Sequence, residues 1–358
     1  MTITSNAGIV SFAPQVSKGV LPTTPVWYRH RATLVDLAVN DPVEEGQPEV
    51  GGIPVPTFPY KSGPIVQGGL TLQPRLEDTL GWLLYGAMGD VASLQDGITG
   101  MYNHTFKLKA SDPSFVPYMS FRKYIPPSDG TTATDLGEVF TDCKIVNLNV
   151  TLPNNGPINA RVDVIGRAFA HDLAPNLWTY ANDFESWESI PIACAVDGYI
   201  KFNTGSGLVE LPVVQASVNF VNVPLDLKQE RIYGDPFIYD VTPVQRRLEF
   251  DLLVKWKNPD LYNQIRTGSP TGTAWSSAPT VGGFEAKAVS SVPMTGMTEP
   301  WSLTFAAAEC ALSLVGGIQL ASNQSIMMRF KGTALANAIN FASIVLKNLK
   351  TAYAWPVI

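Results

Sequence analysis

Alternation of apolar and polar residues constrains the fold of this chain more than any other feature of its sequence. In the runs 146–152, 160–164 and 248–256, apolar side chains stand at every second position with polar or charged ones between them, interrupted once at Leu253. Successive side chains of a β-strand point to opposite faces, so each run can bury one face and expose the other. The pattern predicts a mainly β protein with antiparallel strands.

Glycine and proline support this interpretation. The chain of 358 residues contains 29 glycines and 28 prolines, which are spread along it without a period. Such a composition is rich in turns and excludes a coiled coil, a collagen and a helical bundle. The segment Asn154-Asn155-Gly156, between the first two alternating runs, predicts a tight hairpin turn.

Two short segments have the sequence signature of helices. In 74–88, Pro74 suits the first turn and Gly89 can close the carboxyl end. In 258–268, Asn258 suits the N-cap. The apolar face of the first helix carries Leu76, Leu80, Leu83, Leu84 and Ala87.

The two helical segments lie in halves of similar order. Each follows an alternating strand and precedes a glycine-rich loop and further strands, and each half contains a similar late strand, 161–170 or 327–336. This order predicts an internal repeat of two weakly similar β domains, joined within 171–200. The alternative is a chance resemblance of strand–helix pieces.

Two charged loops, at 38–64 and 223–236, interrupt the alternating pattern. The first is rich in proline, glycine and acidic residues, and a loop of this length in a compact domain is usually functional or disordered. The second precedes a long strand in the other half. Each is either an extended hairpin that leaves its domain or a solvated loop.

The sequence contains no arrangement typical of a catalytic, metal or cofactor site. It lacks a Gly-x-Ser-x-Gly elbow, a phosphate-binding Gly-Lys-Ser/Thr loop and a His-Glu-x-x-His motif. Cys143, Cys194 and Cys310 lie in distant segments, which favours reduced, buried thiols over a disulfide framework or a zinc site. The net charge of −6 argues against a protein that grips nucleic acid. We expect neither catalysis nor a cofactor.

The most apolar stretch, 302–321, is long enough to span a membrane but contains Glu309, Gln319 and the pair Gly316-Gly317. Two strands that meet at the glycines explain it better than a membrane span. The amino terminus has neither the basic region nor the apolar run of an export signal, and it is expected to form an arm or a first strand. We expect synthesis in the cytoplasm.

The order of four segments resembles that of a known family. These are the strand–helix segment 62–90, the strands of 102–123, the two long strands within 140–166, and 213–268 in the second half. In this order the sequence resembles the tail tube proteins of long-tailed, siphovirus-type bacteriophages. The resemblance covers most of residues 60–350 and rests on the order and spacing of hydrophobic patterns and glycines.

The resemblance implies a fold of two tandem tail-tube-like β-sandwich or barrel domains, each with a short flanking α-helix. The first domain comprises 1–185, with an N-terminal arm and the loop 38–64, and the second comprises 186–358. Both contribute strands to an oligomeric β-barrel tube. Because many relatives are shorter and form six-membered rings, two domains per chain imply a ring of three chains with pseudo-sixfold symmetry.

The implied function is that of the major tail tube subunit, a structural virion protein located in the tail. Its stacked rings form the hollow tube through which phage DNA passes without specific binding. Expected partners are further copies of the chain and the tape-measure and tail terminator proteins, without membrane insertion. The contact candidates between subunits or rings are Asp41, Glu44, Glu45 and Glu49 in the first loop and Asp226, Lys228, Glu230 and Arg231 in the second.

The composition is compatible with this function. Only 16% of residues are charged, against roughly 25% in typical domains, which suits a surface that is mostly interface. Net acidity suits a channel that repels phosphate. Two alternatives stay open: another phage β-structural protein, such as a tail terminator or a capsid decoration protein, and a carbohydrate-binding or hydrolytic β-sandwich protein.

Overall fold

The structure is a computed structural model that describes residues 8–48, 50–56, 58–76, 78–97, 100–127, 135–181, 192, 194–203, 207–318, 325–336 and 341–356. Its helices are α1 (Asp78–Met88), α2 (Asp260–Thr267) and the short 3-10 helix η3 (Pro175–Leu177). The strands before residue 186 are β1 (Ile9–Pro14), β2 (Tyr28–His30), β3 (Leu34–Val35), β4 (Ala38–Asn40), β5 (Val43–Glu45), β6 (Pro59–Lys61), β7 (Ile65–Leu72), β8 (Asp90–Gln95), β9 (Tyr102–Lys107), β10 (Met119–Ile125), β11 (Leu136–Pro153), β12 (Asn159–Gly166) and β13 (Ala168–Asp172). Those after it are β14 (Cys194–Asn203), β15 (Leu208–Glu210), β16 (Val213–Pro224), β17 (Pro243–Lys255), β18 (Thr280–Pro293), β19 (Pro300–Leu314), β20 (Met327–Ala334) and β21 (Ser343–Asn348). The prediction of a mainly β protein with two short helices is confirmed.

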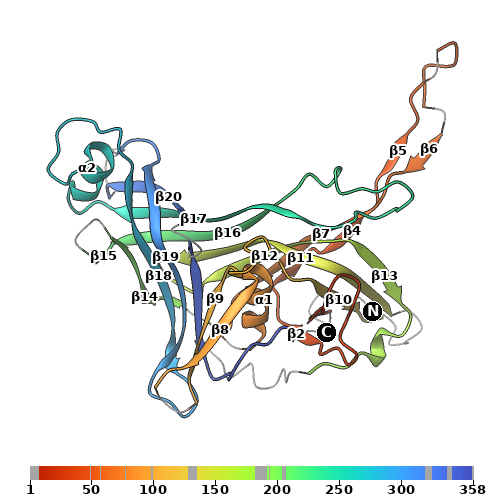
Figure 1. Ribbon diagram of the computed structural model, residues 1–358, viewed down its shortest axis with the longest axis horizontal. Helices are drawn as coiled ribbons and strands as arrows, with labels where there is room; N and C mark the ends of the chain where they lie inside the picture. Colours follow the sequence, from red (N-terminus) through yellow and green to blue (C-terminus); the bar gives the residue numbers. More distant parts are fainter. Residues whose placement is uncertain are drawn as a thin grey trace.

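Eight strands form the centre of the molecule, which we call the main sheet. Their spatial order is β4–β7–β12–β11–β16–β17–β20–β19, and every neighbouring pair is antiparallel (Figure 1). The long strands β11 and β19 also extend beyond it. The first part of β11 pairs with β10 and β13. The first part of β19 pairs with β21, and β18 pairs with β19 from Pro300 to Leu312.

The strand order of the main sheet repeats. In each half, the strand before the helix (β7 or β17) pairs with a later strand (β12 or β20), which in turn pairs with the long strand (β11 or β19). A further strand, β4 or β16, lies on the other side of the strand before the helix. Hydrogen bonds between β11 and β16 join the two halves into one continuous sheet.

The main sheet has one apolar and one polar face, as the alternation predicts. A row of paired residues across the apolar face consists of Leu72, Ala160, Val150, Val218, Phe250, Gly332 and Leu312. The neighbouring row points to the opposite side, which we call the polar face, and consists of Thr71, Arg161, Asn149, Asn219, Glu249, Thr333 and Ala311. The apolar face is buried against α1 and the strands packed beneath it, whereas the polar-face residues are exposed or half-buried.

One residue departs from the predicted alternation. Val146 was expected on the same face as Leu148, but Ile145 is buried in its place and Val146 is half-buried on the other side. The register of β11 against β12 shifts between Ile145 and Asn147. Such a bulge adds a residue to one strand and inverts the side-chain alternation on either side of it.

Helix α1 lies against the apolar face and begins four residues later than predicted. Its residues from Leu80 to Met88 that face the sheet belong to the hydrophobic core, and Gly89 follows with a φ of 100°. Helix α2 forms within the predicted segment, but its N-cap is Pro259 and not Asn258, and no side chain caps its first turn. The helix ends at Gly268, whose φ of 76° lies in the left-handed region. That region costs glycine little, because it has no Cβ.

Other predictions concern the apolar stretch and the thiols. Strand β19 covers most of 302–321 and is followed by Gly316 at a φ of 76°, but the next strand, β20, begins only at Met327. In the described part of the chain, no helix combines the length and the apolar character needed to cross a membrane. Cys143 and Cys310 are free and buried, as expected, whereas the free thiol Cys194 is partly exposed.

Candidate assembly surface

The loop 38–64 forms a hairpin that projects from the body of the molecule. Its strands β5 and β6 pair with Val43 opposite Lys61 and Glu45 opposite Pro59, and they stand clear of the main sheet at the upper right of Figure 1. Its exposed apolar and aromatic side chains are Val43, Val50, Ile53, Val55, Phe58 and Tyr60. A concentration of apolar side chains on a projecting segment is typical of a surface that binds another protein.

The acidic candidates of the hairpin are held by its own side chains. The hydroxyl of Tyr60 donates to Glu44 over 2.8 Å, and this bond, with attraction from Lys228, holds the pKa of the Glu44 carboxyl below its usual value. Lys61 forms an ion pair with Asp41. Glu45 is exposed at the last strand pair, and Glu49 lies outside the described residues.

The second predicted loop, between β16 and β17, meets the base of this hairpin. The Arg231 guanidinium donates to the backbone oxygen of Gly63 over 2.6 Å and to that of Pro236 over 3.3 Å. A side chain at residue 63 would collide with it, because a Cβ there would lie 1.9 Å from Arg231 Nη1. Asp226 accepts from the backbone N–H of Lys228 and closes a local turn. The structure therefore brings the two loops together through Arg231.

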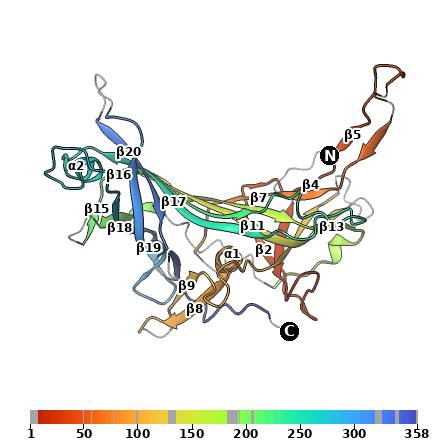
Figure 2. The same cartoon turned by 45° about the horizontal axis from the view of Figure 1, so that its top comes forward.

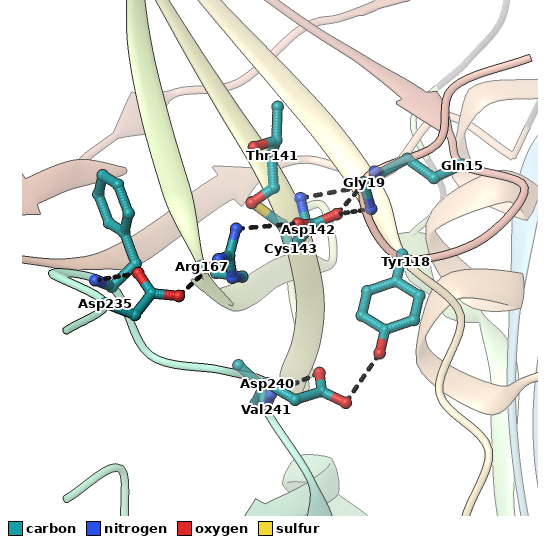
Figure 3. Close-up of polar contacts among 11 residues, drawn as sticks. Gln15, Gly19, Tyr118, Thr141, Asp142, Cys143, Arg167, Asp235, Asp240 and Val241 are labelled. Atoms are coloured by element: carbon teal, nitrogen blue, oxygen red, sulfur yellow. Dashed lines mark hydrogen bonds and ion pairs between the residues drawn. The ribbon is translucent and has the colours of Figure 1, made fainter. Parts of the chain in front are cut away.

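Ion pairs hold the same loop against β11 and β12. Asp235 accepts from Arg167 over 2.8 Å (Figure 3). Asp240 lies 3.0 Å from the Lys144 ammonium. The Tyr118 hydroxyl donates to Asp240 over 2.8 Å. Burial tends to raise the pKa of Asp240, but the attraction of Lys144 outweighs it and holds the pKa below its usual value. The second loop is thus not a freely projecting hairpin like the first.

A bend in β11 lies at the centre of this network. Asp142 has a φ of 54°, and its carboxylate accepts from the Gln15 side chain over 2.9 Å and from the backbone N–H of Gly19 over 2.5 Å (Figure 3). At this position β11 exchanges its partners β10 and β13 for β12 and β16. The left-handed conformation, which aspartate tolerates better than most residues, allows the strand to bend there.

The sequence analysis missed the members of this network. Glu230 and Arg231 were selected, but Asp142, Lys144 and Asp240 were not. A signal exists in the sequence: Asp142-Cys143-Lys144 places two charges inside an otherwise apolar run, where the structure buries both side chains. Buried charges in such a run require partners, which only the fold could identify.

This geometry defines a class of protein. A two-faced sheet, an edge at β3 and β4 that pairs only with β7 among the described strands, and a projecting apolar hairpin are features of a subunit built for assembly. Within the described residues, no three His, Cys, Asp or Glu side chains gather where they could hold a metal ion.

The sequence profile of the phage tail tube protein family matches residues 5–339, which is nearly the whole chain. The chain belongs to the phage tail tube protein family. It is a structural, non-enzymatic component of the phage tail, and tail tube proteins polymerise. No curated protein matches the sequence.

Proposed function

We propose that this chain is the major tail tube subunit of a long-tailed, siphovirus-type phage and that it polymerises into stacked rings around a channel for DNA. The repeated strand order of the main sheet carries this proposal. Each half supplies four neighbouring strands, so one chain offers two similar units to the wall of a ring.

The two units correspond to the proposed tandem domains, 1–185 and 186–358. Within the chain, the long strand β11 of the first unit pairs with β16, which begins the second. We take this junction as the template for contact between chains. The end of β19 would exchange its pairing with β18, where Thr280–Gly282 lie opposite Cys310–Leu312, for the β3–β4 edge of the next copy. Exposed strand edges readily accept such additional strands.

The proposed ring contains three chains with pseudo-sixfold symmetry. Three copies of the main sheet give a closed barrel of about 24 strands, and barrels above about 16 to 18 strands enclose an aqueous channel. The β5–β6 hairpin and the loop between β16 and β17 then contact the next ring or subunit. The proposed contact residues are Asp41, Glu44, Glu45 and Glu49 on the hairpin, and Asp226, Lys228, Glu230 and Arg231 on the loop.

The proposed partners follow from this assembly. A stack of rings exposes one ring face at each end, and a tail terminator protein would close one of them. A tape-measure protein would occupy the channel during assembly, and DNA would later pass through the channel without specific binding. None of these contacts inserts the chain into a membrane.

Negative-stain electron microscopy of the purified protein across a concentration series tests the proposal. We expect hollow tubes, with image averaging that resolves three chains per ring. Discrete rings that never stack would favour a tail terminator or decoration protein. Monomers at every concentration would favour a binding or hydrolytic β-sandwich protein and refute the proposal.

The role of the hairpin is tested by shortening it. Replacing 46–58 with Asn-Gly keeps the last strand pair, Glu45 opposite Pro59, and closes it with a two-residue turn. We expect a folded subunit, by circular dichroism, that no longer forms tubes. A matched variant with an intact tip, in which Asp41, Glu44 and Glu45 are changed to their amides, separates the loss of charge from the loss of apolar contact. Normal tubes from the shortened variant would contradict the assignment of the hairpin.

A further inference from the structure

Among the residues that the structure describes, no other element covers the polar face of the main sheet, whose side chains are exposed or half-buried. Helix α1 and the strands β8 and β9 all lie on the other side of the sheet (Figure 2). The outer perimeter of a closed wall is longer than the inner one, so the side that carries this additional layer fits on the outside. If the chain forms the proposed ring, the polar face is then directed toward the channel.

The arginines of this face are matched by carboxylates. Arg161 lies 2.9 Å from Asp36 and 2.6 Å from Asp163. Arg247 lies 3.7 Å from Glu249. The neighbouring strands β11 and β16 carry uncharged Asn and Ser or Thr side chains on this face. The net charge of −6 of the chain is therefore not concentrated here.

Asp251 on β17 pairs with two cations of β20, and the positive charge that remains is balanced by the second carboxylate at Arg161. Asp251 accepts two hydrogen bonds from Arg329, over 2.8 and 2.6 Å, and lies 3.9 Å from the Lys331 ammonium. Both cationic side chains are more than half exposed, at 56% and 57%, whereas Asp251 is 22% exposed. A bidentate contact of this kind fixes the plane of the guanidinium. Without Asp251, both positive groups would be directed into solvent on the same face.

We infer that the polar face lines the channel as an electrically neutral surface, and that Asp251 prevents Arg329 and Lys331 from binding the phosphates of duplex DNA. Lysine and arginine that contact phosphates release counterions and bind DNA of any sequence. A channel through which DNA slides must avoid such contacts at every ring. On this surface, pairing each cation with a nearby carboxylate prevents phosphate contacts, without any need for the overall acidity of the chain.

The orientation of the face is tested by thiol labelling of Thr333→Cys, an exposed position on β20, two residues beyond Lys331. A small maleimide and a maleimide on a large polyethylene glycol are compared on subunits and on assembled tubes. We expect both reagents to label subunits and only the small one to label tubes. Thr295→Cys, at an exposed turn between β18 and β19, is the control that both reagents label in tubes. Equal labelling of Thr333→Cys by the large reagent in tubes and subunits would overturn the inference.

Neutralisation is tested by co-sedimentation of a short fluorescent duplex DNA with tubes across a salt series. We expect wild-type tubes to retain little DNA and Asp251→Asn tubes to retain it at low salt. The slope of log affinity against log salt should steepen by about one or more. Asp251→Asn/Arg329→Gln restores the charge of the surface and should return to wild-type behaviour. Asp251→Asn tubes that bind no more DNA than wild type would refute the inference, whereas a failure of the wild type to form tubes would refute the proposed function.

Discussion

Replacing Arg246 should destabilise the protein far more than replacing its neighbour Arg247. The Arg246 guanidinium donates to the backbone oxygens of Ala87 and Met88, at the carboxyl end of α1, over 2.6 and 2.8 Å. It also donates to the Asn222 side chain over 2.7 Å. Arg246 thereby connects the helix of the first half to β16 and β17 of the second. Burial lowers its pKa to about 10, so it stays charged at neutral pH.

The size of the effect follows from these contacts. Hydrogen bonds to charged groups contribute about 1.5–3 kcal/mol each, and carbonyls left without a partner add a further cost. The amide of Asn222 also donates to Ala87 and so retains part of the cap. We therefore expect Arg246→Met to lower the free energy of unfolding by about 3–5 kcal/mol. Arg247 is 44% exposed, and Arg247→Met should change it by less than about 0.5 kcal/mol.

Urea unfolding of both variants, followed by circular dichroism, measures this difference. With a slope of about 3 kcal/mol per molar urea, Arg246→Met should shift the midpoint down by about 1–1.5 M. Amide exchange in the last turn of α1 should accelerate in the same variant. Arg246→Lys should recover part of the loss, since an ammonium reaches fewer of the oxygens. Midpoints of Arg246→Met and Arg247→Met that differ by less than about 0.3 M would refute the reasoning.

Three further predictions concern buried groups. Burial lowers the pKa of His30 to about 4, below the value of about 6.5 in the unfolded chain. Because the unfolded state then binds more protons, the free energy of unfolding should fall by about 3 kcal/mol as pH drops from 6.5 to 4. Thermal unfolding of His30→Gln should show a weaker pH dependence in that range. Lys144→Met leaves the Asp240 carboxylate without its ammonium partner and should lower the free energy of unfolding by about 2–4 kcal/mol. In urea unfolding, Lys144→Met/Asp240→Asn should recover at least half of this loss. Equal midpoints for the two variants would exclude Lys144 as the partner that stabilises Asp240. Gly332→Ala places a Cβ 1.9 Å from Cζ of Phe250 and should lower stability by about 2–3 kcal/mol, and a melting temperature equal to that of wild type would contradict it.

Much of the fold could be predicted from local patterns. The runs that become β12 and β17, and residues 148–152 of β11, alternate in burial, because the period of a strand is itself local. The end of helix α2 at Gly268 was predicted correctly from the local sequence, whereas its N-cap is Pro259 and not the predicted Asn258. For the segment 38–64, which is rich in proline, glycine and acidic residues, the sequence allowed either a solvated loop or a hairpin. Its register, with Val43 opposite Lys61, required the structure.

The sequence by itself determined several of the strands, the segments of the two α-helices, that one face of the sheet is apolar, and that a long charged loop is present at 38–64. Only the tertiary structure decided which strands are neighbours, because β11 pairs with β16 over a separation that no local pattern encodes. It also decided that Arg246 is half-buried against the end of α1 and Arg247 is exposed, although the two residues are chemically identical and adjacent. Their roles differ because alternate side chains of a strand face different surroundings, and these surroundings are supplied by distant segments.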